Sequence, residues 1–250
     1  MSPEVIVCAD TDALARRGCK IVVADAEEAI AARGVFRVAL SGGSTPAALY
    51  KMLADPEGPA ALLDEDRTQF FFGDERVVPF TSPDSNGGMA RTALFKKKRF
   101  PDDAFFAVPT GKRTRDEAAQ EYTKILAEAF GLRPNGPAPP EFDLVFMGLG
   151  EDGHTASLFP HNASLSVTDK WIVGSPPGTL PPPVDRITLT FPVFNVARHT
   201  LFLVAGEKKA EIVHHILRDN PPVEEAPTAG IRPANGRVTW LLDKAAARLL

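Results

Sequence analysis

The chain is poor in cysteine, with only Cys8 and Cys19 among its 250 residues. Their spacing matches neither a CxxC redox pair nor the grouped cysteine and histidine ligands of a zinc site. We therefore expect buried or inert thiols and a reducing compartment.

Long hydrophobic runs are also missing. The longest apolar stretches have the length of a strand, as in residues 201–206, whereas a membrane helix needs about 20 apolar residues. Residues 1–18 lack the basic start and long apolar run of a signal peptide. The sequence therefore predicts a cytoplasmic protein that does not contact a membrane.

Basic residues do not accumulate in one place. The chain has 28 Lys and Arg against 32 Asp and Glu, a formal net charge of −4, and its longest basic block is KKKR at residues 96–99. A nucleic-acid binder usually presents a broader basic face. We therefore expect no nucleic-acid partner and interpret KKKR as a solvated helix end. A few local donors would have to bind any anionic ligand.

The composition is that of an ordinary globular protein, with 44% hydrophobic and 24% charged residues. The length suits one α/β domain over residues 1–250. Several runs are apolar almost throughout, as strands covered on both faces are, and helical patterns separate them. This alternation predicts an α/β fold with a mostly parallel, doubly wound, Rossmann-like sheet flanked by helices. The expected strands are 36–41, 68–74, 142–148, 199–206 and 237–243, and the expected helices are 45–54, 115–130 and 206–220.

Ligands of open α/β sheets bind at the carboxyl ends of the strands, and the first such loop is LSGGSTP at residues 40–46. Its glycines permit close backbone approach and its hydroxyls donate hydrogen bonds. Thr45 before Pro46 looks like a helix N-cap, and a helix start favours phosphate. The Gly-Lys-Ser/Thr ending of a nucleotide P-loop is absent, and a plain strand-to-helix turn stays an alternative. The candidate substrate-binding residues here are Ser41, Gly42, Gly43, Ser44 and Thr45.

A second strand end carries Asp74, Glu75 and Arg76. An arginine here can fork onto a phosphate or carboxylate, although a solvated charged turn is the simpler interpretation. Lys209, after a later strand, and Arg186, after a proline-rich loop, are further candidates for binding an anion. We expect Lys208 to point to solvent.

The densest polar cluster is GEDGHTASLFP at residues 150–160. His154 can act as a general base near neutral pH, and Glu151 or Asp152 can orient it or cap a following helix. A lone histidine offers too few ligands for a metal, and no HExxH motif is present. We interpret Thr155 and Ser157 as helix-start or packing residues. The other histidines are expected to be structural, namely His161, His199, His214 and His215.

Five motifs in this order resemble those of 6-phosphogluconolactonases, within the wider glucosamine-6-phosphate isomerase/6-phosphogluconolactonase superfamily. They are LSGGSTPAALY, FFFGDERVVP, MGLGEDGHTASLFP, RITLTFPVFNVA and GEKKAE, and they span residues 40–211. Two positions depart from the deaminases of that superfamily. Arg76 stands where they usually have an aromatic residue, and Phe159 where they have a glutamate of the proton relay.

The resemblance implies hydrolysis of 6-phospho-D-glucono-1,5-lactone to 6-phosphogluconate, the second step of the oxidative pentose phosphate pathway. By the same resemblance His154 is the general base, and Asp74 and Arg76 are the substrate-site pair. The expected catalytic residues are His154, Asp74 and Asp152. Arg76 and Lys209 are then the phosphate ligands beside residues 41–45, with Arg186 as a further contact. No metal or cofactor is implied. The expected partner is a phosphorylated sugar lactone, and a monomer is expected.

Two alternatives remain at this stage. One is a sugar-phosphate deaminase or isomerase, in which Asp74 would move a carbon-bound proton. The other is a sugar-phosphate sensor, although residues 1–35 are too few and too acidic for the DNA-binding segment that such sensors commonly carry.

Overall fold

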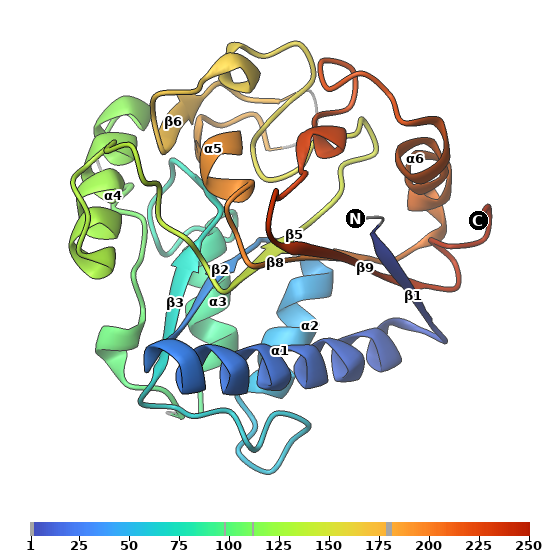
Figure 1. The fold of residues 1–250 in the computed structure, drawn as a ribbon, viewed down its shortest axis with the longest axis horizontal. Coiled ribbons are helices and arrows are strands. Elements are labelled where there is room, and N and C mark those ends of the chain that lie inside the picture. The colour runs from blue at the N-terminus through green and yellow to red at the C-terminus, as the bar shows by residue number, and fades with distance from the viewer. Residues whose placement is uncertain (1–2, 98, 112, 179–181) are drawn as a thin grey trace.

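A six-stranded parallel sheet forms the centre of the protein (Figure 1). The computed structural model describes residues 3–97, 99–111, 113–178 and 182–250. The strand order is β1-β9-β8-β5-β2-β3. In chain order these strands are β1 Glu4–Cys8, β2 Phe36–Leu40, β3 Thr68–Phe72, β5 Leu144–Met147, β8 His199–Val204 and β9 Arg237–Asp243.

Helices cover both sides of this sheet, with α1 and α2 on one side and α5 and α6 on the other (Figure 1). This arrangement confirms the predicted α/β class and its mostly parallel, Rossmann-like sheet. The α-helices are α1 Thr11–Arg33, α2 Ser44–Leu53, α3 Asn86–Phe95, α4 Arg115–Phe130, α5 Phe191–Phe194 and α6 Ala210–His214.

A small antiparallel sheet lies apart from the main one, and the sequence did not predict it. Its order is β4-β7-β6, with bounds β4 Asp74–Arg76, β7 Arg186–Leu189 and β6 Ile172–Ser175. β4 has only three residues, all charged, so neither an apolar run nor an alternating pattern marks it. The edge strand β1 was also missed. Its apolar run covers only Val5 to Cys8, and Val5 and Val7 are 40% and 51% exposed, so it lacks the long buried pattern of the central strands.

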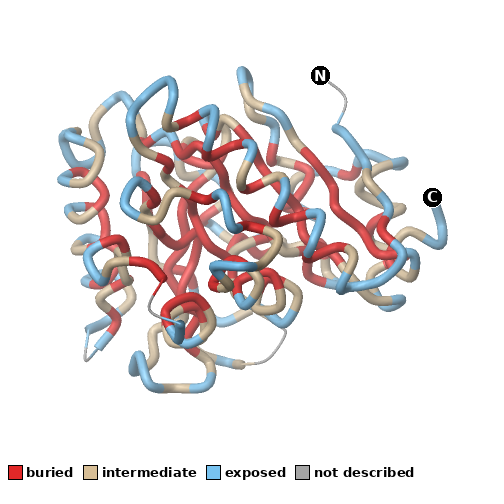
Figure 2. The backbone as a smooth tube through the Cα atoms, turned by 90° about the horizontal axis from the view of Figure 1, so that it is seen from below, coloured by how far each residue is buried: buried red, intermediate tan, exposed pale blue. Residues whose placement is uncertain are grey.

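The core explains why the remaining strands were recognisable. β5 and β8 are buried at every position, and Phe70, Phe71 and Phe72 of β3 are also buried. Figure 2 shows buried backbone through the centre and exposed backbone around it. Phe71 stacks on Phe106 with ring centroids 4.4 Å apart. Strands covered on both faces must be apolar throughout, and this is the pattern from which they were predicted.

Helix ends follow local capping chemistry. α4 begins after Thr114, whose side chain forms a capping box with Glu117, and it ends at Gly131, which has φ 64°. The predicted helix over residues 206–220 instead divides into a 3-10 turn, Glu207–Lys209, then α6, then a π-helical turn, His215–Asp219.

The interpretation of KKKR as a solvated helix end was wrong for Arg99, whose side chain is 1% exposed. Its guanidinium forms an ion pair with Glu65, and it donates hydrogen bonds to backbone carbonyls of the loop after α2, those of Leu53, Asp55, Ala60, Ala61 and Leu63. A charged side chain becomes buried here because one planar group satisfies several otherwise unpaired carbonyls. Lys98 lies outside the described residues.

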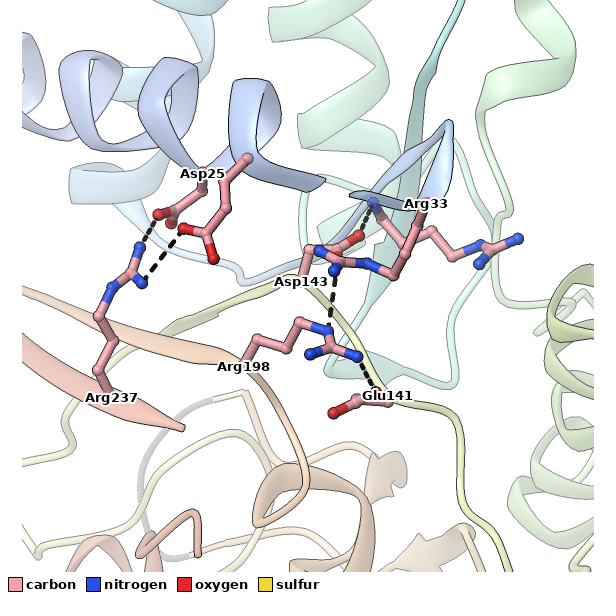
Figure 3. A network of polar contacts seen from close by, with 8 residues as sticks. Asp25, Arg33, Glu141, Asp143, Arg198 and Arg237 are labelled. Atoms are coloured by element: carbon pink, nitrogen blue, oxygen red, sulfur yellow. Dashed lines mark hydrogen bonds and ion pairs between the residues drawn. The ribbon is translucent and has the colours of Figure 1, made fainter. Parts of the chain in front are cut away.

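Charged residues also cluster at the amino ends of the strands (Figure 3). Asp143, just before β5, pairs with Arg33 of α1 at 2.6 Å, and Asp25 of α1 pairs with Arg237 at the start of β9. His199 is buried, with Nδ1 2.7 Å from Asp25 and Nε2 2.9 Å from Thr239. The prediction that His199 is structural is confirmed, because its contacts tie α1 to the sheet.

Both cysteines are free and buried, as predicted. Burial raises the pKa of the Cys19 thiol to about 12 and also raises that of Cys8. Among the described helices, none has the length and apolar character to span a bilayer.

Candidate active site

A pocket of about 220 Å³ opens where the strands end at their carboxyl side. It is bounded by the loops after β2, β5 and β8 and by β4, which follows β3, as expected for parallel strands that share one edge. Eight residues singled out from the sequence line it. They are Ser41, Gly42, Gly43, Asp74, Arg76, His154, Arg186 and Lys209.

Asp152 does not line the pocket but holds the ring of His154. Its Oδ1 lies 2.5 Å from His154 Nδ1 and also accepts the His154 backbone N–H. A carboxylate at Nδ1 fixes the proton on that nitrogen and leaves the lone pair on Nε2. Burial raises the pKa of Asp152, but the hydrogen bond and charge of His154 outweigh it, so the net shift is downward.

The loop takes this shape because residue 150 has no side chain. A Cβ on Gly150 would lie 2.0 Å from His154 Nδ1 and 2.5 Å from Asp152 Oδ1. Glu151 is exposed, so Asp152 is the carboxylate that orients the ring. Asp152 does not take the alternative role of capping a following helix, because the next helical element is a 3-10 turn over Ala163–Ser166 that Asn162 caps.

The aromatic ring of Phe159 separates the imidazole from a guanidinium. Its centroid is 4.9 Å from that of His154, and Arg186 Cζ lies 5.4 Å from the Phe159 ring. Phe159 lines the pocket and is 5% exposed. From the sequence it stood out only as a departure from the deaminases, whereas in the fold it forms a wall of the pocket.

Asp74 is buried between two hydrogen-bond donors. Ser157 Oγ donates to its Oδ2 at 2.7 Å, and Asn86 Nδ2 lies 3.3 Å from its Oδ1. Ser157 does not start a helix, because residues 155–158 form a turn, but it is fully buried, as expected of a packing residue. Its hydroxyl also reaches another strand, which was not expected. Asn86 was not found from the sequence, since one asparagine before two glycines gives no chemical signal.

Glu75 faces away from solvent and caps α3. Its carboxylate accepts the backbone N–H groups of Asn86 at 2.7 Å and Gly87 at 2.6 Å, and the Ser85 hydroxyl at 3.1 Å. Burial raises the pKa of Glu75, and these backbone N–H groups oppose that effect. Glu75 thus fixes the start of α3, which carries Asn86.

Arg76 and Arg186 stand opposite each other in the β4–β7 pair. Arg76 donates to the Asp84 carbonyl at 2.8 Å and Arg186 to the Pro182 carbonyl at 3.2 Å. Among the described residues, neither buried Nε has a hydrogen-bond partner. Burial lowers the pKa of Arg186, Asp74 opposes this, and Arg76 adds to it. Two adjacent cations with free donors are suited to a bound anion.

The glycine loop differs from its prediction in one respect. α2 begins at Ser44, with Gly43 (φ 107°) as N-cap, so Thr45 is not the cap. Gly43 adopts a backbone conformation that side chains disfavour, which allows the helix to start one residue early. Ser44 and Thr45 do not line the pocket, and Ser44 borders a separate groove between α1 and α2. Their backbone N–H groups nevertheless belong to the helix N-terminus.

Lys209 ends the 3-10 turn after β8 and is partly buried, whereas Lys208 is exposed as predicted. Burial lowers the pKa of Lys209, while Glu151 and Asp152 oppose this shift. Lys209 lines the same pocket as His154, Arg76 and Arg186.

Several further residues line the pocket that sequence reasoning did not assign to it. Besides Asn86 and Phe159 these are Gly148, Leu149, Gly150 and Ala156. Ala156 has φ 49°, a left-handed conformation that is unusual for alanine and is not visible in sequence. Within the part of the chain that the structure describes, no three His, Cys, Asp or Glu side chains are grouped to hold a metal ion.

Comparisons with known proteins agree with this architecture. The family of glucosamine-6-phosphate isomerases/6-phosphogluconolactonase matches residues 9–240. A Synechocystis protein named 6-phosphogluconolactonase is 38% identical, over 100% of this chain and 99% of its own length. The human protein of that name is 39% identical, over 88% of this chain and 82% of its own length.

Solved structures with the same fold include proteins of this family. A 6-phosphogluconolactonase from Trypanosoma brucei superposes with a TM-score of 0.86 at 36% identity, covering 100% of this chain and 99% of the other. A monomeric glucosamine-6-phosphate deaminase shares the fold at a TM-score of 0.78 and 19% identity, covering 99% and 100% of the two chains. The chain therefore belongs to the glucosamine-6-phosphate isomerase/6-phosphogluconolactonase family.

Proposed function

We propose that the protein hydrolyses 6-phospho-D-glucono-1,5-lactone to 6-phosphogluconate, the second step of the oxidative pentose phosphate pathway. The relatives named 6-phosphogluconolactonase support this substrate. The observation that carries the proposal is the 2.5 Å contact between Asp152 and His154, in a pocket that also contains Arg76 and Arg186. A general base and two cations that line one pocket suit a phosphorylated lactone.

In this mechanism His154 Nε2 removes a proton from water, and the water oxygen attacks the lactone carbonyl carbon. Asp152 stabilises the imidazolium that forms. When the tetrahedral intermediate collapses, the bond from this carbon to the ring oxygen breaks, and His154 returns its proton to that oxygen. The carboxylic acid product then loses a proton to solvent.

The cations divide between the two ends of the substrate. We assign the phosphate to Arg76 and Arg186, beside the backbone N–H groups of Gly43 and Ser44 at the start of α2. Lys209 lines the same pocket, and we place its ammonium near the oxyanion of the tetrahedral intermediate. This division differs from the resemblance alone, which pairs Arg76 with Lys209.

The test compares lactone hydrolysis by the parent and His154→Gln, each measured above the spontaneous opening of the lactone. We expect a loss of about 10²- to 10⁴-fold in kcat, the usual contribution of a general base. His215→Gln is the matched control, because that imidazole contacts Asp219 on the surface. An unchanged rate for His154→Gln would assign the base to another group.

The two alternatives are tested with the same preparation. Ammonia release from glucosamine 6-phosphate at enzymatic rates would identify a deaminase. Binding of the lactone without faster loss than in buffer would identify a sensor. The single domain, the monomer and the cytoplasmic location stay predictions.

A further inference from the structure

Asp74 connects two loops that are distant in sequence. Its Oδ2 accepts the hydroxyl of Ser157, which belongs to the loop that carries His154. Asn86, the first residue of α3, places Nδ2 3.1 Å from the Asp74 carbonyl and 3.3 Å from its Oδ1. The exposed fractions of Asp74, Ser157 and Asn86 are 5%, 0% and 2%. None of these contacts is exposed to competing solvent.

The direction of the Asn86 contacts is fixed by chemistry. A carbonyl and a carboxylate oxygen only accept hydrogen bonds, so the NH₂ group of the amide must face them. Oδ1 then points toward the glycine loop, where a Cβ on Gly42 would lie 1.9 Å from it. Asn86 therefore fills the space that the missing side chain of Gly42 leaves. It packs against the glycine loop while it hydrogen-bonds Asp74, and among the described residues its buried Oδ1 has no hydrogen-bond partner.

The contact of Ser157 links the His154 loop to the strand of the phosphate-binding arginine. Asp74 is the first residue of β4 and Arg76 is the last. The backbone carbonyl of Ser157 separately accepts the Ser175 hydroxyl at 2.9 Å. Replacing Ser157 by alanine therefore removes the link to Asp74 and keeps the attachment to β6.

We propose that Ser157 and Asn86 are positioning residues that act through Asp74, which they hold as a hydrogen-bond acceptor joining the His154 loop, β4 and the glycine loop. The kinetic consequences of this proposal rest on the lactonase function proposed above. In this arrangement Asp74 transfers no proton. Its two oxygens keep the general base and the anion site at the separation that one sugar phosphate requires.

Each link governs a different part of the site, so the two variants have different kinetic signatures. Ser157→Ala frees the loop of His154 and lowers kcat, with KM within about threefold of the parent. Asn86→Ala leaves Gly42 without its neighbour and raises KM for the phosphorylated lactone, with a smaller change in kcat. We expect kcat to fall about 10- to 100-fold in Ser157→Ala and KM to rise about 10- to 100-fold in Asn86→Ala, because each donor bonds a charged group. Equal effects on kcat and KM in both variants would contradict the assignment.

A double-mutant cycle tests whether Ser157 acts through Asp74. We expect Ser157→Ala to lower kcat/KM by about 10- to 100-fold in the parent and by less than about twofold in Asp74→Ala. Thr155→Val is the matched control, since its buried hydroxyl donates to the Gly148 carbonyl of its own loop at 2.8 Å. Thr155→Val should lower kcat/KM by the same factor in the parent and in Asp74→Ala. An equal loss from Ser157→Ala in both backgrounds would overturn the proposal.

The same cycle in thermal unfolding separates this proposal from the lactonase function. If the parent shows no turnover above spontaneous hydrolysis, the proposed function fails. The Tm values of the four proteins still report on the link, because a contact between Ser157 and Asp74 makes the two Tm decreases non-additive. Additive decreases would show that the two residues are not coupled.

Discussion

Arg76 and Arg186 face each other across β4 and β7, and each has a buried Nε without a hydrogen-bond partner among the described residues. Like charges directly opposite on paired strands destabilise a sheet. Buried polar groups without partners add a further cost. Under the proposed function, the phosphate of the substrate supplies a negative charge to this pair, so its cost in stability accompanies anion binding.

The arginine pair gives the first prediction. Arg186→Gln removes one of two repelling cations, so the free protein should unfold at the same or a higher temperature than the parent. The same change should raise KM for the lactone by about 10- to 100-fold, since hydrogen bonds to charged groups contribute about 1.5–3 kcal/mol. Differential scanning calorimetry and steady-state kinetics measure the two effects. A lower Tm with an unchanged KM would assign Arg186 a structural role.

Asp152→Asn gives the second prediction. An amide at this position can donate to Nδ1 and favour the tautomer with its proton on Nε2, which cannot accept a proton from water. We expect kcat to fall about 10²- to 10⁴-fold with little change in KM. Asp219→Asn is the control, because its carboxylate contacts His215 on the surface. Activity close to that of the parent would show that the orientation of the ring does not depend on this carboxylate.

The lowered pKa of Asp152 adds a pH dependence to the same comparison. A carboxyl whose pKa is lower in the folded state stabilises the protein above its unfolded value of about 3.9. That contribution is lost as the pH falls through the folded value. The stability difference between the parent and Asp152→Asn should therefore shrink as the pH falls below about 4. Chemical denaturation at several pH values measures this difference in unfolding free energy. A difference that grows toward low pH would contradict a lowered pKa of Asp152.

Much of this fold could be predicted because its signals are local. α4 was expected over 115–130 and occupies that range, since its capping residues and Gly131 are adjacent to it in sequence. The buried strands read as continuous apolar runs. The loops that follow them could be placed at one edge, since parallel strands align their carboxyl ends.

The missed features depend on partners far away in sequence. β4 is a strand only because β7 pairs with it, and that pairing places Arg76 opposite Arg186. Asn86 and Ser157 hydrogen-bond to Asp74, which is 12 and 83 residues away from them in the chain. Arg99 becomes buried because a loop before β3 turns its carbonyls toward it. No periodicity within one segment records such contacts.

Gly150→Ala is the third prediction. The added Cβ would lie 2.0 Å from His154 Nδ1, a distance that forces the ring and Asp152 apart. We expect kcat to fall by about 10²-fold or more, because a small misplacement of a catalytic group has this effect. Gly148→Ala is the control on the same loop, since its Cβ would meet only Ser41 Oγ at 3.8 Å. We expect kcat of Gly148→Ala to fall at most a few-fold. Equal losses in the two variants would mean that the loop tolerates no side chain at either position.

Tyr50 carries the last prediction. Its hydroxyl accepts the Ser41 N–H at 2.9 Å and donates to the Ser41 carbonyl at 2.8 Å, at the end of β2 where the glycine loop begins. Tyr50→Phe leaves both backbone groups buried without partners, which costs about 1–3 kcal/mol of unfolding free energy. Because Ser41 anchors the glycine loop, KM should also rise several-fold.

Thr239→Val is the comparison for Tyr50→Phe. It removes a buried hydroxyl that contacts His199 at the amino ends of the strands, at the edge opposite the pocket. Urea denaturation should show a loss of stability for both variants, whereas kinetics should show a higher KM for Tyr50→Phe alone. If both variants lose stability and KM stays at the parent value in both, the tyrosine supports the core but does not shape the loop that binds the anion.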